Sequence, residues 1–319
     1  VCVSYPGTLR SDVSKLRTLG VDGRSTATTL FAISVLRRLC TTSELPEEAR
    51  KLLSFTDNRQ DAALQAGHFN DFVRVASVRS ALLTALQDGD SSGIRSTDLP
   101  EAIFDGLDVP TEEYARDPAA RGLAREDAAS ALRRVLEYHV YRDLERGWRI
   151  NTPNLEQCGL LAFDYRGLAD CSEDDEVWAG NSTLAQADHA VRKRLCRVLL
   201  DLLRKNLCIL NDRLRRIMQE RFSNESRQHL SEMWAISEED ERDGLLQSRF
   251  ALAGPRPRGG RGTGNLFPVS GRSAFARYVK SPQGLGDLGQ DLTTDDLQQI
   301  VDALFEGLCA HGLLVRGEE

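Results

Sequence analysis

The 319-residue sequence lacks the features of a membrane protein and of a self-sufficient ATP-driven enzyme. It has no run of 18 uncharged apolar residues, so it predicts no membrane span. Its first residues do not resemble a secretory leader. It contains no G-x-x-x-x-G-K-[ST] loop and no acidic strand end that would hold magnesium. We therefore expect no bound cofactor in this chain and no ATP hydrolysis by it alone.

Metal-binding and nucleophilic motifs are also missing. The seven cysteines are scattered and include no C-x-x-C pair, which excludes a zinc site of the usual spacing. An odd number of scattered cysteines is typical of reduced thiols, so we expect a cytoplasmic protein. None of the five histidines lies in an H-E-x-x-H or G-x-S-x-G context, and each is interpreted as a packed or surface residue. The sequence thus predicts no metal site and no catalytic residue.

Aromatic residues are scarce as well, at 6%, whereas 41% of residues are hydrophobic, which is enough for a core. The common residues are Leu, Ala, Arg, Glu and Asp, which favour helices over sheets. The net charge of −7 argues against a small, freestanding DNA-coating protein, since these are usually basic. It leaves room for a local basic surface, because charges act over short distances at physiological salt.

The N-terminal part has the alternating pattern of an α/β unit. We predict a helix over residues 25–39, with Ser25 as its cap, from an apolar stripe at helical spacing. The sequence KLLSF at 51–55 predicts a buried parallel strand that ends at a turn. A second helix follows over 59–86, with a break near Gly67.

The remainder predicts mostly helices. One long helix is expected over 125–145 and the longest over 184–222, with an apolar stripe opposite a basic face. The stripe contains Leu195, Val198, Leu199, Leu202, Leu210, Leu214 and Ile217. The basic face contains Arg192, Lys193, Arg194, Arg197, Arg204 and Lys205, which we interpret either as phosphate contacts or as partners of acidic neighbours.

The C-terminal part predicts a helix capped by Thr294 and ended at Gly312, followed by a strand at 313–316. A helix that turns at glycine into a short strand is typical of the entry to a winged-helix wing. The predicted domains are therefore a partial α/β domain at 1–87, a helical domain at 88–253, an Arg/Gly/Pro linker at 254–264 and a winged-helix-like segment at 265–319.

Two groups of residues are candidates for nucleic-acid binding. The first group would lie at the carboxyl end of the predicted strand, the usual binding edge of an α/β sheet, and consists of Thr56, Asn58, Arg59 and Gln60. The alternative is an ordinary connection in which Asp57 or Asn58 caps the helix. The second group is in the linker and consists of Arg256, Arg258 and Arg261, whose alternative is a solvated flexible loop.

The segment SFTDNRQDAALQAGHF resembles the fourth conserved motif of large bacterial DEAD/DEAH-box helicases of superfamily 2, with the pattern L-L-x-F-[ST]-D-[NS]-R-Q-D-A-A. The segment LEYHVYRDLERGWRINTPNLEQCGLL resembles part of a helical insertion in the same proteins. The resemblance implies the start of the second RecA-like lobe of a P-loop NTPase at 51–69, followed by that insertion. It also implies that Thr56, Asn58 and Arg59 approach the nucleic-acid backbone.

The fold class that we expect is therefore mainly α with a small α/β part. The implied function is that of a non-catalytic fragment of an ATP-dependent DNA helicase or translocase, often used in genome defence or repair. The parent would use ATP and Mg²⁺, but a Q-x-x-G-R-x-x-R arginine finger is also absent here. The expected partners are DNA and the remaining helicase domains, in the same or a neighbouring chain. The alternative is a freestanding helical interaction module that assembles with a separate motor or regulator.

Overall fold

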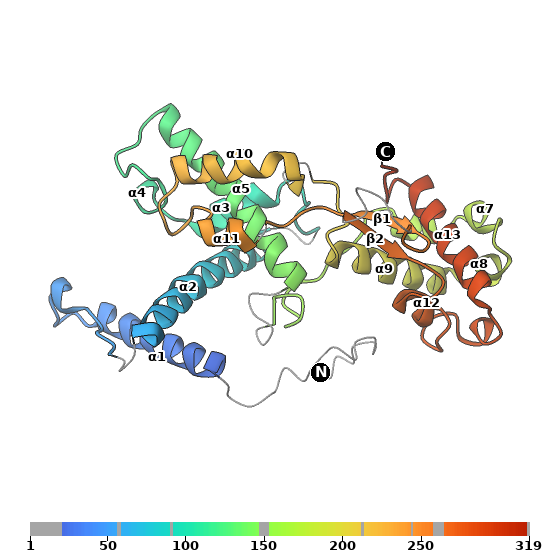
Figure 1. Cartoon of the computed structure of the whole chain (residues 1–319), viewed down its shortest axis with the longest axis horizontal. Coiled ribbons are helices and arrows are strands. Elements are labelled where there is room, and N and C mark those ends of the chain that lie inside the picture. The colour runs from blue at the N-terminus through green and yellow to red at the C-terminus, as the bar shows by residue number, and fades with distance from the viewer. Residues whose placement is uncertain are drawn as a thin grey trace. The chain divides into compact units, whose positions relative to one another are not determined.

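The structure is a computed structural model and describes residues 21–55, 59–89, 92–146, 153–211, 214–243, 245–257 and 265–317. It is mainly helical and its described residues contain two short strands (Figure 1). The chain divides into two compact units. We call residues 11–160 with 223–243 the N-terminal unit, and residues 161–222 with 244–319 the C-terminal unit. The mainly-α fold class is thereby confirmed, and the domain boundaries predicted from the sequence stay predictions.

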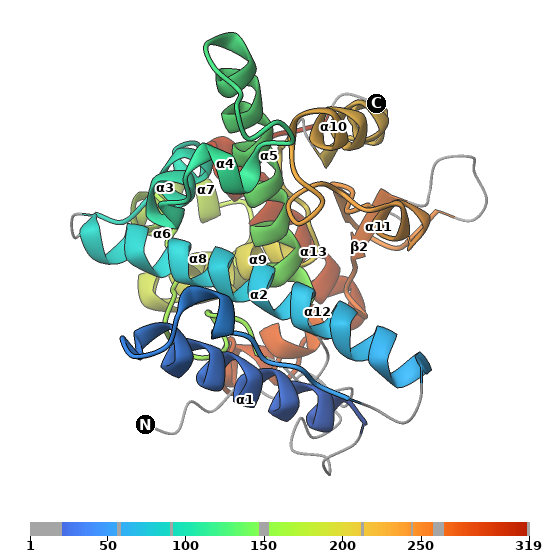
Figure 2. The same cartoon turned by 90° about the vertical axis from the view of Figure 1, so that its left-hand side faces the viewer.

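The N-terminal unit begins with α1 (Val21–Thr41), the 3-10 helix η1 (Glu47–Ala49) and the long α2 (Arg59–Asp88). The helices α1 and α2 lie beside each other, as Figures 1 and 2 show. α2 runs through Gly67 without the predicted break. α1 starts before Ser25, so Ser25 lies within the helix and is not its cap. Both predicted helices are thus present, with one wrong cap and one wrong break.

α2 packs closely on α3 (Leu99–Leu107) because of a glycine at the contact. A Cβ at Gly106 would lie 2.5 Å from the carbonyl oxygen of Ala81 on α2, which is closer than real Cβ atoms come. Glycine is unfavourable inside a helix by about 1 kcal/mol relative to alanine. The close approach of the two backbones explains why glycine stands at this position.

The rest of this unit consists of α4 (Thr111–Tyr114), α5 (Leu123–Arg146), the end of α10 (Arg216–His229) and α11 (Glu238–Asp243). Ion pairs join the helices around α5: Arg79 of α2 binds Asp143 through two hydrogen bonds of 2.6 and 3.0 Å, and Arg142 binds Asp240 at 2.6 Å. The core of the N-terminal unit is largely apolar. The most buried members include Ile103, Leu132, Val135, Leu136, Leu230 and Ile236.

The C-terminal unit contains α6 (Leu168–Glu173), α7 (Asp175–Trp178), α8 (Ser182–Gln186) and α9 (His189–Lys205), then α12 (Ala274–Val279), the 3-10 helix η4 (Gly286–Gly289) and α13 (Thr294–Ala310). One apolar core, including Trp178, Leu199 and Leu304, joins these helices. The cap of α13 is Thr293, one residue before the predicted Thr294, and it forms a capping box with Asp296.

The end of α13 follows the prediction. Gly312 has a φ of 69°, and Leu313 N–H donates to Leu308 O at 2.9 Å, which is the bond of a Schellman motif. The predicted strand at 313–316 is wrong, because these residues form no strand. The two strands lie elsewhere: β1 (Phe250–Ala253) pairs in parallel with β2 (Leu266–Val269), beginning with Phe250 opposite Leu266.

The predicted helix over 184–222 is wrong in its length. α9 ends at Lys205 because Leu207 takes a left-handed conformation with a φ of 57°, and Cys208 N–H bonds back to Leu203 O. A residue with a left-handed backbone conformation cannot continue a right-handed α-helix. Leu210, placed by the sequence in the buried stripe, is consequently 76% exposed. α8 is likewise separate from α9, and α10 starts only at Arg216.

The predicted strand at 51–55 is also wrong, since these residues form neither helix nor strand. A parallel strand needs neighbours that accept and donate its backbone hydrogen bonds. Within the described part of the N-terminal unit there is no other strand to supply them.

Candidate nucleic-acid contacts

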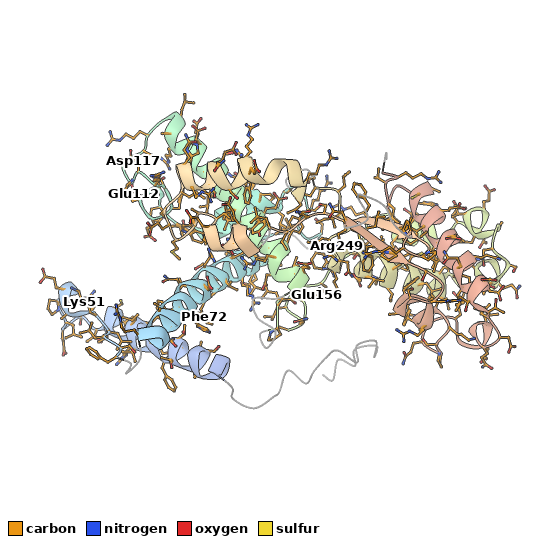
Figure 3. All side chains as sticks on the ribbon, in the orientation of Figure 1. Lys51, Phe72, Glu112, Asp117, Glu156 and Arg249 are labelled. Atoms are coloured by element: carbon orange, nitrogen blue, oxygen red, sulfur yellow. The ribbon has the colours of Figure 1, made fainter. Side chains whose placement is uncertain are left out.

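The segment before α2 is displayed on the surface. Leu53 and Phe55 are 80% and 88% exposed, and Figure 3 marks Lys51 on this segment and Phe72 on α2. Arg59 is exposed and is the first residue of α2, where the partial positive charge of the helix N-terminus adds to its own. Gln60 is the next residue of the same helix.

The positions of Thr56 and Asn58 lie outside the described residues. Of the first group of candidates, the structure therefore places Arg59 on the surface, in agreement with a role in binding a large anionic ligand.

A buried polar cluster fixes α2 against α1 a few turns beyond Arg59. His68 is 2% exposed and Thr29 is 0% exposed. Thr29 Oγ1 lies 3.0 Å from His68 Nδ1, and Gln65 Nε2 donates to Thr29 Oγ1 at 3.0 Å. Thr26 Oγ1 lies 3.2 Å from His68 Nε2. Since both ring nitrogens of His68 are occupied by hydroxyl groups, this histidine has a packing role, as the sequence predicts.

Of the three linker arginines, the structure describes Arg256 alone. Arg256 is exposed, and its Nη2 donates to Leu266 O on β2 at 3.1 Å. Arg258 and Arg261 lie outside the described residues. The two strands that flank this segment were missed by sequence reasoning, because FALA and LFPV are too short to show a clear alternation. Arg256 belongs to the C-terminal unit and Arg59 to the N-terminal unit, so each is a candidate contact by itself.

The predicted basic face of α9 is largely occupied by contacts within the unit. Arg192 is 2% exposed, and its guanidinium donates to Leu184 O at 2.7 Å and to Asp175 Oδ1 at 2.5 Å. Arg197 binds Asp164 at 2.6 Å. Arg204 lies 3.6 Å above the ring of Phe163. The second interpretation from the sequence, pairing with acidic neighbours, therefore fits these arginines.

The same hydrogen bonds shift the pKa values of the carboxyl groups that accept them. A hydrogen bond from Arg197 lowers the pKa of Asp164, and a hydrogen bond from Arg192 lowers the pKa of Asp175. Both carboxylates are thus ionised at neutral pH and compensate the charge of α9. This helix has few guanidinium groups left for an external phosphate.

Two thiols and a histidine in the C-terminal unit do not form an active site. Cys171 and Cys196 are both 0% exposed, and their mutual hydrogen bond lowers the pKa of Cys171 and raises that of Cys196. His311 Nε2 lies 3.1 Å from Asp174 Oδ2. Because both thiols are enclosed by the core, no substrate reaches them.

A buried histidine in the N-terminal unit is electrostatically unusual. His139 is 7% exposed, and its Nε2 has no hydrogen-bond partner. Burial, with the nearby charges of Arg74 and Arg142, lowers its pKa to about 3. The ring is therefore neutral at physiological pH.

A hollow of about 460 Å³ between α2 and α3 is lined on both sides by acidic residues, including Asp88, Asp105 and Asp108. Its charge would repel a phosphate group. In the residues that the structure describes, no group of three His, Cys, Asp or Glu side chains is arranged to hold a metal ion. Among the same residues, no helix is both long and apolar enough to cross a membrane.

Comparison with known proteins gives no relative of this chain. No protein-family model, no curated protein and no solved structure matches it. The interpretation of function therefore depends on the residues themselves.

Proposed function

We propose that this chain is a non-catalytic part of an ATP-dependent DNA helicase or translocase, to which it contributes nucleic-acid contacts and scaffold of the second motor domain. The observation that carries the proposal is the exposed apolar segment at 51–55, directly before the α2 residues RQDAALQAGHF. In the helicase motif that it resembles, this segment is a strand of a RecA-like sheet. Leu53 and Phe55 here remain 80% and 88% exposed.

α1 supports the proposal with a second exposed apolar group. Leu30, Phe31 and Val35 are 49%, 73% and 42% exposed. Single exposed apolar residues are common, but a group of them on neighbouring elements marks a surface that another protein part covers. Further strands and helices of a motor domain would cover α1 and residues 51–55 together. We therefore propose the remaining helicase domains, in the same or a neighbouring chain, as the partner of this surface.

The nucleic-acid contacts in this proposal are Thr56, Asn58, Arg59 and Gln60, and separately Arg256, Arg258 and Arg261. These side chains suit the sugar–phosphate backbone, which is contacted by guanidinium, hydroxyl and amide groups. ATP and Mg²⁺ would be bound by the other domains.

The second candidate function is a helical module that binds a separate motor or regulator. The charge of the N-terminal unit favours it, since residues 11–160 and 223–243 contain 21 Lys or Arg and 30 Asp or Glu. A net charge of −9 opposes binding to a polyanion. In this alternative the exposed apolar surface of α1 and 51–55 would bind the partner, and nucleic acid would not bind at all.

A binding titration with a matched pair of variants separates the two functions. Arg59→Gln removes the exposed charge at the start of α2, and Arg125→Gln removes an exposed charge on α5. We expect Arg59→Gln to weaken binding of a labelled oligothymidylate several-fold at low salt, with Arg125→Gln close to the parent. The whole chain should hydrolyse no ATP. Equal binding by the two variants would remove Arg59 from the contact, and no binding by any form would favour the interaction module.

A further inference from the structure

The sheet of the C-terminal unit has two different faces. One face packs on the core through Ala251, Ala253, Phe267 and Val269. Because side chains alternate along a strand, the residues between these point to the opposite side. The residues of this outer face are Phe250, Leu252, Leu266 and Pro268. Leu252, Leu266 and Pro268 are half-buried, whereas Phe250 is 57% exposed.

An arginine is bonded to the strand residue that pairs with the exposed phenylalanine. Leu266 is the residue of β2 that pairs with Phe250, and its carbonyl oxygen accepts the hydrogen bond from Arg256 Nη2. Paired strands are about 4.8 Å apart, so the guanidinium lies close to the end of the sheet that carries Phe250. The hydrogen bond uses one of the five N–H groups of the side chain, and Arg256 is exposed.

The ring of Phe250 lies beside the backbone near the end of the described residues. A Cβ at Gly317 would lie 3.1 Å from Phe250 Cδ1 and 3.2 Å from Phe250 Cε1, so Gly317 lies beside one edge of the ring. Arg249 precedes Phe250 at the start of β1, where Figure 3 marks it, and Arg316 precedes Gly317. Arg256 and Arg316 are exposed, whereas Arg249 is half-buried and, by the same alternation, lies on the opposite side of the strand from Phe250.

The geometry points to a stacking platform for single-stranded nucleic acid on this face, with one base on the ring of Phe250 and an adjacent phosphate on Arg256. This inference rests on the proposed function and adds a base contact that the sequence does not predict. Exposed aromatic rings on a sheet, next to arginines, bind unpaired bases because every base has a π-face. A duplex would not fit, since its bases are already stacked.

The size and charge of the face favour this ligand over a protein. A stable protein interface buries about 800 Å² on each partner. Four apolar residues, three of them half-buried, expose less than that, whereas a base needs only one ring. Residues 161–222 and 244–319 also contain 19 Lys or Arg and 18 Asp or Glu, so the C-terminal unit lacks the acidity of the N-terminal unit.

The test is fluorescence anisotropy of the full chain with labelled oligothymidylate of about 20 nucleotides at low salt. Phe250→Leu keeps the apolar side chain but removes the ring, and we expect binding about tenfold weaker. Phe250→Tyr keeps the ring and should bind as the parent does. Arg256→Gln should weaken binding and reduce the salt dependence by about one phosphate contact.

The matched control is Arg37→Gln, at an exposed position on α1, which should bind as the parent does. Thermal melting should be the same for all variants. If the chain binds and Phe250→Leu binds equally well, the platform is wrong while the proposed function stands. If the parent chain does not bind, the proposed function fails with it. Binding of an acidic peptide that depends on Phe250, without binding of oligothymidylate, would assign the face to a protein partner.

Discussion

The two compact units differ in the hydrogen bonds that their helix ends and arginines make within the unit, and in the apolar side chains that they expose. In the C-terminal unit, α8, α9, α12 and α13 each begin with a side-chain cap, and the long arginines of α9 bind carbonyls and carboxylates of the same unit. In the N-terminal unit, α3 and α4 have no side-chain cap, and α6 of the C-terminal unit has none either. The clearest difference is the exposed apolar group on α1 and residues 51–55 of the N-terminal unit, the surface on which we propose that another domain packs.

The two units also differ in net charge. The N-terminal unit has nine more acidic than basic residues, and the charges of the C-terminal unit nearly balance. Charges of one sign repel a ligand of that sign, and a weakly charged surface permits local contacts. We infer that the C-terminal unit is the better place for a nucleic-acid contact, and that Arg59 acts as an isolated basic residue on an acidic unit.

The largest expected effect is on the C-terminal unit. Arg192→Ala would remove a buried guanidinium that donates to Leu184 O, Ala185 O and Asp175 Oδ1. We expect a loss of about 3 kcal/mol in the free energy of unfolding, measured by denaturant titration. Lys193→Ala, at the exposed neighbouring position, should change it by less than about 0.5 kcal/mol. Equal effects of the two substitutions would contradict the structural role of Arg192.

The free energy of unfolding should depend on pH through His139 of the N-terminal unit. The pKa of His139 is about 3 in the folded chain and 6.5 as its ordinary value, so the unfolded chain binds the proton more readily. Stability is therefore lost as the pH falls below 6.5, by up to about 1.4 kcal/mol for each pH unit.

His139 contributes this loss between pH 6.5 and about pH 4.5. The carboxylates with lowered pKa, such as Asp240 and Glu241, contribute only at lower pH. His139→Leu should flatten the stability profile in that window. A profile that remains equally steep in His139→Leu would show that another group carries the effect.

The close contact of α2 and α3 should tolerate no Cβ. Gly106→Ala would place a methyl group against the carbonyl of Ala81, and we expect a loss of about 1 to 3 kcal/mol. Gly67→Ala in α2 is the control, since no atom lies within 4 Å of a Cβ there. That substitution should stabilise the chain slightly through helix propensity. Thermal melting of the pair measures both, and a stabilised Gly106→Ala variant would refute the packing argument.

The smallest expected effect is at the proposed domain surface. Phe55→Ser should change the free energy of unfolding by less than about 0.5 kcal/mol, because the side chain is 88% exposed. The same substitution should reduce self-association of the chain at high concentration, measured by sedimentation velocity. A large loss of stability would mean that Phe55 is packed within this chain, and the argument for a missing neighbour would fail.

The sequence predicts the long helices well, because their apolar spacing and end signals agree. The helix predicted at 125–145 is Leu123–Arg146, and Gly312 ends α13 as expected. Prediction from the sequence fails where contacts between elements, and not local residues, determine the structure. The break after Lys205 depends on a left-handed Leu207, which has no local signal, and the expected strands at 51–55 and 313–316 lack neighbours to pair with in the described part of the chain.

Prediction of the candidate nucleic-acid contacts was limited in the same way, by contacts between elements. Sequence pattern selects Arg59 and Arg256, and both are exposed. It also selects the basic residues of α9 as a face, although Arg192 is buried and Arg197 is paired. Helical periodicity gives the side of a helix on which a residue lies, but not what the neighbouring elements place against it. For the same reason, Phe250 could not be recognised before β1 and its register were known.

The most direct test of the account is the salt dependence of oligothymidylate binding by the full chain, measured by anisotropy from about 50 mM to about 200 mM salt. We predict measurable binding at the lower concentration, a linear fall of the logarithm of the association constant with the logarithm of salt, and no ATP hydrolysis. Absence of binding at about 50 mM salt would contradict the proposed nucleic-acid contacts and favour a protein-binding module.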